Sequence, residues 1–106
     1  MIRVIGFYRW EEGAEFNHEY YNSKHMTLTK ELLVSHGLIR LESDSYISDK
    51  PPFEGEIIAT SNAYFRDLLA AQTAMASVGE ALMEDVPKYT TLAPEIRITN
   101  VTSHAL

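Results

Sequence analysis

The chain has no cysteine, only five glycines and four prolines, and no long apolar run. Without cysteine there is no disulfide scaffold, iron–sulfur cluster, thiolate zinc site or cysteine nucleophile. No stretch approaches the roughly 20 apolar residues of a membrane-spanning helix, and no cleavable signal core is present. We therefore expect a cytoplasmic protein with no membrane partner.

Basic residues are also scarce: nine Lys and Arg stand against fifteen Asp and Glu, for a formal charge of -6. An acidic chain repels phosphate backbones, so no nucleic-acid partner is expected. The sequence has no G-x-G-x-x-G, P-loop or nucleophile-elbow motif, and we expect no cofactor. We also expect no metal, because His18 and His25 would lie about 10.5 Å apart along a helix. The acidic pair Glu84-Asp85 is predicted to be solvated.

The 106 residues are enough for one domain, and their patterning predicts its elements. We expect strands over Ile2–Tyr8, Leu38–Ser48, Glu56–Phe65 and Glu95–Thr102, a helix over Ala14–His36, and two short helices, Leu68–Ala76 and one from Ser77 to the stop at Pro87. This β-α-β-β-α-β order is the ferredoxin-like pattern, an α+β fold with a four-stranded antiparallel sheet. Such a sheet has helices on one face only. We expect apolar groups of the other face, such as Ile58 and Ile98, to pack against a second copy in a C2 homodimer.

Local signals set the predicted helix limits. Asp67 is a candidate N-cap, Ser77 opens an S-x-x-E capping box, and Gly37 suits a helix C-terminus. The first helix carries two apolar rows, Phe16/Tyr20 and Tyr21/His25/Leu28/Leu32. These rows diverge on a straight helix, so we expect a break near Asn22-Ser23, two residues that compete with helical hydrogen bonding.

Two stretches resemble a known family. Phe16-x-x-x-Tyr20-Tyr21-x-x-x-His25-x-x-Leu28 resembles the first helix of the EthD family of small dimeric α+β barrel proteins. A second match consists of Ala74-Met75-Ala76-Ser77, Glu80 and Asp85-Val86-Pro87-Lys88-Tyr89-Thr90. The chain departs from the family at Thr27, where proline is frequent, and at Lys88-Tyr89, where asparagine and an aromatic residue are usual.

The resemblance implies a dimeric α+β barrel that binds a small, largely apolar organic molecule in a cavity within each subunit. It also implies a link to oxidoreductase or monooxygenase catabolism. Cofactor-independent acid/base chemistry would fit an oxidation, isomerisation, cyclisation or dehydration. One alternative is a non-catalytic accessory or carrier protein for a partner oxygenase, and another is haem binding, as in relatives on the same barrel.

His25 is the candidate catalytic residue, because imidazole titrates near neutral pH and transfers protons without a cofactor. Tyr21, one turn earlier, is its candidate orienting neighbour. The candidate ligand-binding residues are Tyr8, Tyr20, Leu28, Leu32, Phe65, Met75 and Tyr89. The competing interpretation of His25 is a core histidine bonded to a backbone carbonyl or a tyrosine. The aromatic residues also suit the core and a dimer interface, which for any one of them outweighs a pocket.

Overall fold

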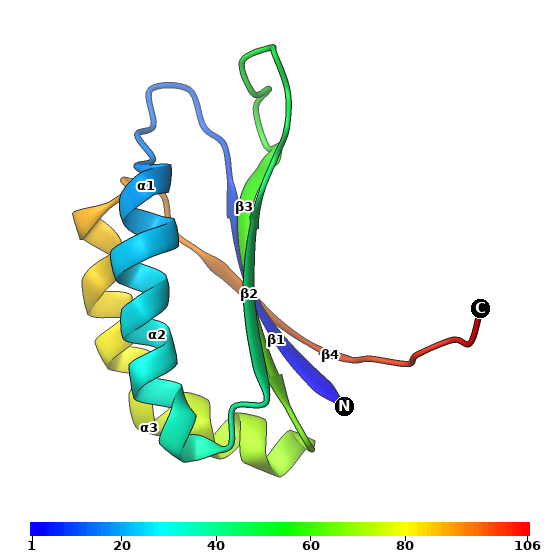
Figure 1. The fold of residues 1–106 in the computed structure, drawn as a ribbon. Coiled ribbons are helices and arrows are strands. Elements are labelled where there is room, and N and C mark those ends of the chain that lie inside the picture. The colour runs from blue at the N-terminus through cyan, green and yellow to red at the C-terminus, as the bar shows by residue number, and fades with distance from the viewer.

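The computed structural model describes residues 1–106 and contains one antiparallel sheet with the order β2-β3-β1-β4. Its strands are β1 (Ile2–Arg9), β2 (Arg40–Ser45), β3 (Ile57–Phe65) and β4 (Glu95–Asn100). The helices are α1 (His18–Tyr20), a π-helical turn (Tyr21–His25), α2 (Met26–Leu33), a 3₁₀ turn (Val34–His36), α3 (Leu68–Asp85) and a second 3₁₀ turn (Val86–Lys88). They cover one face of the sheet, while the C-terminal tail runs away from the body (Figure 1). The predicted ferredoxin-like topology is confirmed, and no helix has the length and apolar content to cross a bilayer.

Strand register decides which residues face the helices. Val4 pairs with Ala63 and Ile98, and paired residues point to the same side of a sheet. Val4 packs with buried residues of α3, so Ile98 shares the helical face. It is 44% exposed there, on the edge strand β4, whereas Ile58 is 2% exposed in the core. The expectation that both lie exposed on the far face was wrong, because the register places Ile98 beside Val4.

The buried core consists of two clusters. One is mainly aromatic and contains Tyr8, Tyr21, Met26, Ile58, Ala59, Val86, Tyr89 and Leu92. The other is mainly aliphatic and contains Val4, Leu33, Ala63, Phe65, Ala71, Ala74 and Val78. Both clusters contribute walls to one cavity between the helices and the sheet. The cavity, which is the candidate site, therefore lies between the aromatic and the aliphatic cluster.

The second helical region is a single helix, α3. Asp67 caps it as predicted, accepting a hydrogen bond from the Ala70 N–H at 2.8 Å, which lowers the Asp67 pKa. The prediction of a new start at Ser77 was wrong: the Ser77 hydroxyl donates to the Thr73 carbonyl one turn earlier, inside the helix. A buried stripe that includes Ala74 and Val78 holds the segment continuous across the would-be cap.

The first helical region begins at Asn17, whose side chain accepts from the Tyr20 N–H at 3.0 Å, and not at Ala14. The break expected near Asn22-Ser23 is the π-helical turn Tyr21–His25. A π turn adds one residue to the helical repeat, so it changes which later residues face the sheet. Consequently Thr29 and Leu33 are buried in α2. Gly37 then ends the region in the left-handed conformation, at φ 87°, as its type predicts.

Candidate functional site

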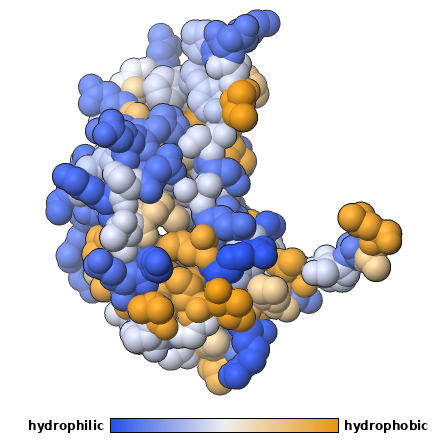
Figure 2. Space-filling view, in the orientation of Figure 1, coloured by the Kyte–Doolittle hydropathy of each residue, from blue (hydrophilic) through white to orange (hydrophobic).

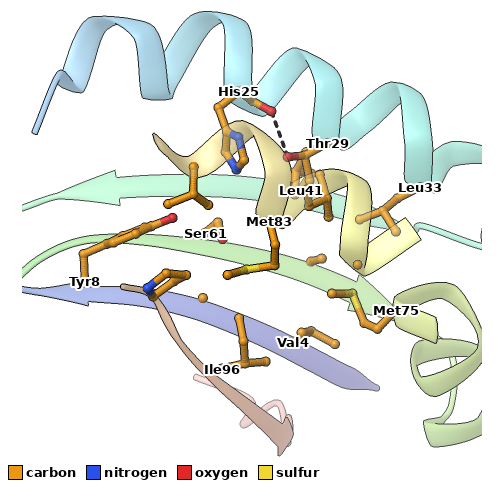
Figure 3. Close-up of a pocket in the computed structure, with 16 residues that line it drawn as sticks. Val4, Tyr8, His25, Thr29, Leu33, Leu41, Ser61, Met75, Met83 and Ile96 are labelled. Atoms are coloured by element: carbon orange, nitrogen blue, oxygen red, sulfur yellow. Dashed lines mark hydrogen bonds between the residues drawn. The ribbon is translucent and has the colours of Figure 1, made fainter. Parts of the chain in front are cut away.

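A cavity of about 320 Å³ lies between α3 and the helical face of the sheet. Its walls are mostly apolar and come from all four strands, the π-helical turn, α2 and α3. Tyr8 and His25 stand at one end and Met75 at the other, with Met83 between them (Figure 3). Met83 on α3 and Ile96 on β4 line the cavity and are 48% and 45% exposed. The mouth of the cavity therefore lies between α3 and the uncovered edge strand.

His25 forms a buried pair with Asp85. The His25 Nδ1 lies 2.9 Å from the Asp85 Oδ2, and both residues are 6% exposed. His25 occupies the last position of the π-helical turn, which directs its ring toward the cavity (Figure 3). The Thr29 hydroxyl donates to the His25 carbonyl at 2.8 Å, so the turn is fastened from the following residues. π turns of this kind are frequent at functional sites.

Asp85 has two further partners. The Tyr20 hydroxyl donates to Oδ1 at 3.1 Å, and the Lys88 Nζ lies 3.5 Å from the same oxygen. Burial by itself would raise the Asp85 pKa, but the hydrogen bonds from His25 and Tyr20, together with the nearby positive charge, outweigh it and lower this pKa. Asp85 is therefore a carboxylate at neutral pH. A carboxylate only accepts, so Nδ1 of His25 carries the proton.

The opposite nitrogen of His25, Nε2, has no hydrogen-bond partner within the chain. In a neutral imidazole with Nδ1 protonated, Nε2 is the basic nitrogen. The ring lines the cavity, so this nitrogen is available to a molecule inside it. Asp85 therefore orients the imidazole by its Nδ1 side, and the ring lines an apolar cavity.

Two tyrosine rings pack against the His25 imidazole. Tyr21 stacks on it with ring centroids 5.7 Å apart, and Tyr89 lies at 4.7 Å on a tilted plane. The hydroxyls of Tyr8 and Tyr89 form a hydrogen bond, and the hydroxyl of Tyr21 is buried without a partner. Burial raises the pKa of all three tyrosines, so they remain neutral donors. Only Tyr8 lines the cavity among them.

The candidate residues thus fall into three groups. Tyr8, His25 and Met75 line the cavity. Tyr20, Tyr21 and Tyr89 lie behind this wall, in contact with Asp85, His25 or Tyr8. Phe65, Leu28 and Leu32 are not part of the wall: Phe65 is fully buried in the aliphatic cluster, and the π turn places Thr29 and Leu33 at the cavity in place of the two leucines.

Asp85 was missed, because the prediction of a solvated Glu84-Asp85 pair was wrong for the second residue. One sequence signal pointed to it. A carboxylate in the last turn of a helix opposes the helix dipole, so it requires a compensating partner. Asp85 ends α3 and finds that partner in His25, sixty positions away. Ser61 and Gly79 also line the cavity and carried no such signal.

A second hollow, of about 450 Å³, lies outside the core between α2 and the edge strand β2. Val34 and Ile39 line it and are largely exposed. Figure 2 shows apolar residues gathered between the helical layer and the sheet, below mostly hydrophilic surface. Leu41 lines both this groove and the internal cavity, and so separates them. No three His, Asp or Glu side chains converge in a way that would hold a metal ion.

Fold and site together define a ferredoxin-like α+β protein with a buried His–Asp pair at the wall of an apolar cavity. Comparison with solved structures supports the fold. The chain is similar to an EthD-like protein from Ralstonia eutropha JMP134, at a TM-score of 0.81 and 24% identity, over 98% of this chain and 94% of that one. It is also similar to an EthD family protein from Bacillus halodurans C-125, at a TM-score of 0.70 and 22% identity, over 96% and 99% of the two chains.

No protein-family model matches the sequence, and no curated protein matches it. At these identities the structural likeness shows the fold. It is the fold that the sequence resemblance implied.

Proposed function

We propose that the chain is an EthD-like protein that binds a small, largely apolar and uncharged organic molecule in the internal cavity and transfers a proton to or from it through His25. The observation that carries this proposal is the pairing of His25 with Asp85 beside the cavity, which occupies Nδ1 and leaves Nε2 free for a molecule in the cavity. The chemistry needs no cofactor, because the imidazole is itself the acid and base.

The cavity wall indicates the ligand's charge. No Lys or Arg lines it, and its polar groups are limited to His25, Tyr8, Ser61 and Thr29. A carboxylate or phosphate buried there would lack a cationic partner, which is costly in an apolar site. The polar groups suit a single oxygen function, a hydroxyl or a carbonyl, with an apolar body beyond it. At about 320 Å³ the cavity is at the lower end of the size range of ligand pockets.

Asp85 is a positioning residue in this mechanism. Its carboxylate holds the Nδ1–H tautomer and stabilises the imidazolium that forms when Nε2 takes a proton. Tyr21 and Tyr89 both pack against the imidazole and restrict the orientation of its plane. Proton abstraction from a carbon next to a carbonyl, or from a phenol hydroxyl, is a step shared by isomerisation, cyclisation, dehydration and oxidation of an activated substrate. The site supports that common step.

The far face of the sheet supports a homodimer as part of the proposal. Arg9 and Arg97 lie over the Phe7 ring at 5.3 and 5.7 Å, and Arg40 lies 4.1 Å over Tyr64. Aromatic and arginine side chains are enriched at protein interfaces, and the helices leave this face open. Light scattering during gel filtration should give twice the monomer mass of 12.0 kDa. We propose a cytoplasmic location for this dimer, because a chain without cysteine forms no disulfide that would require an oxidising compartment.

The decisive experiment follows a proton without assuming a substrate. 2-Tetralone is uncharged, largely apolar and bears exchangeable protons beside its carbonyl. In deuterated buffer, proton NMR should show that the wild-type protein accelerates exchange at these positions. His25→Gln should reduce that acceleration by about 10²- to 10⁴-fold, the usual contribution of a general base. His104→Gln, in the exposed tail, is the matched control and should exchange at the wild-type rate.

The outcomes separate the catalytic proposal from the accessory or carrier alternative. Exchange that persists in His25→Gln overturns the base assignment. Tight binding of 2-tetralone by the wild type with no acceleration of exchange would favour the accessory or carrier alternative. Absence of binding, measured by calorimetry, would refute the proposed ligand class.

A further inference from the structure

Gly79 lies in the interior of α3, far from either helix end. Glycine destabilises a helix interior relative to alanine, because it loses more backbone freedom on folding. The glycines with positive φ are Gly13, Gly37 and Gly55, so Gly79 has a backbone conformation that any residue adopts. The helix itself therefore gives no reason for glycine at this position.

Packing gives no reason either. A Cβ added at Gly79 would meet one atom within 4 Å, the Met75 Cε at 4.0 Å, which is ordinary contact with the end of a flexible side chain. Gly6, the other glycine in the cavity wall, differs: a Cβ there would lie 3.0 Å from the Ser61 Oγ. What a side chain at position 79 would occupy is the cavity that Gly79 lines.

Gly79 also lies away from the polar end of the cavity. It is six residues before Asp85 on the same helix, which is about 9 Å along the axis. The α3 residues that line the cavity around it are Met75, Leu82 and Met83, all apolar. A ligand whose oxygen contacts His25 would extend its apolar end toward this stretch of α3.

We propose that Gly79 is a specificity-determining residue: the absence of a side chain there sets how long an apolar group the cavity accepts beyond His25. This rests on the proposed function, because it assumes a ligand with its oxygen at the His25 end. Glycine at position 79 lowers the stability of α3 and, in return, leaves room for a longer ligand. Replacing it should stabilise the free protein while shortening the ligands that fit.

The test uses phenol, 4-ethylphenol and 4-butylphenol, with dissociation constants from titration calorimetry. In the wild type, affinity should rise roughly threefold to fourfold per added methylene, the worth of burying that group. In Gly79→Leu the rise should stop: 4-butylphenol should bind at least about tenfold more weakly than to the wild type, while phenol stays within about threefold. Gly79→Ala should lose about threefold for 4-butylphenol alone, and its melting temperature without ligand should rise by about 2–5 °C.

Ala81→Leu is the matched control, since Ala81 is exposed two residues further along α3 and should leave every affinity unchanged. Equal loss for all three phenols, or wild-type affinity for 4-butylphenol in both Gly79 variants, would overturn the proposal. If the wild type binds none of the three phenols, the proposed function is refuted, and the proposed role of Gly79 is refuted with it. The two failures are distinguishable, because the first is seen only in the variants. Should Gly79→Leu unfold, Gly79→Ala decides the outcome alone.

Discussion

Asp85→Asn tests the centre of the site without any knowledge of the substrate. The substitution keeps the shape of the side chain and removes its negative charge. In the wild type, that charge receives the His25 Nδ1–H at 2.9 Å, the Tyr20 hydroxyl at 3.1 Å and the Lys88 ammonium at 3.5 Å. The variant thus weakens three contacts of a buried side chain, since Asp85 is only 6% exposed.

The magnitude follows from the two hydrogen bonds. A bond to a charged group contributes about 1.5–3 kcal/mol, against about 0.5–1.5 kcal/mol for a neutral pair. Converting the bonds from His25 and Tyr20 to neutral ones therefore costs about 2 kcal/mol in total. With an unfolding entropy of about 2.1 cal/mol/K per residue, the chain loses about 0.22 kcal/mol of stability per degree near the midpoint, so the melting temperature should fall by about 9 °C at neutral pH.

The loss should depend on pH in one direction. The pKa of Asp85 is lower in the folded protein than its ordinary value of 3.8. The carboxylate therefore contributes stability that is fully present above about pH 4 and disappears as the pH falls through the folded pKa. Below that point the wild type is protonated at Asp85 and resembles the variant, so the difference between their melting temperatures should shrink.

Circular dichroism melts from neutral pH to about pH 2.5 give both measurements. Glu84→Gln is the matched control: it removes the same charge from an exposed neighbour and should change stability by less than about 0.5 kcal/mol. The reasoning is refuted if Asp85→Asn costs no more than Glu84→Gln at neutral pH, or if its cost is the same in acid.

Three further predictions concern the surrounding residues. Tyr89→Phe removes the hydroxyl that bonds Tyr8 and should lower the free energy of unfolding by about 1 kcal/mol. Tyr21→Phe removes a buried hydroxyl with no partner and should leave the melting temperature equal or higher. A larger loss of stability in Tyr21→Phe than in Tyr89→Phe would contradict the structure. Nitrogen-15 NMR of the wild-type protein at neutral pH should show a proton on the Nδ1 of His25, and an Nδ1 without a proton would contradict its pairing with Asp85. Asp67→Ala deletes the α3 cap and should lower the melting temperature by a few degrees, with Asp49→Ala in an exposed loop as the unaffected control.

Much of the fold could be predicted from local sequence patterns. Alternating and apolar runs predicted all four strands, and single-residue signals at Asp67 and Gly37 predicted two helix ends, because caps and left-handed turns depend on a few neighbouring atoms. The capping signal at Ser77 was equally local, but no helix begins there. The buried alanines and Val78 pack α3 against the sheet and keep it continuous through this position. Where a local preference and core burial disagree, burial decides, since it involves more contacts.

The sequence by itself determined the order of the elements, the apolar character of the core and the presence of one histidine on the inner side of the first helical region. Only the tertiary structure decided what that histidine does. Its partner Asp85 is sixty positions away, and the π turn that aims its ring also moved the inner face from Leu28 and Leu32 to Thr29 and Leu33. Pairing across such a separation leaves no trace in periodicity. The two diverging rows indicated a break in the helix, but they did not reveal the one-residue change of phase after it, because that change is selected by what the folded chain brings together.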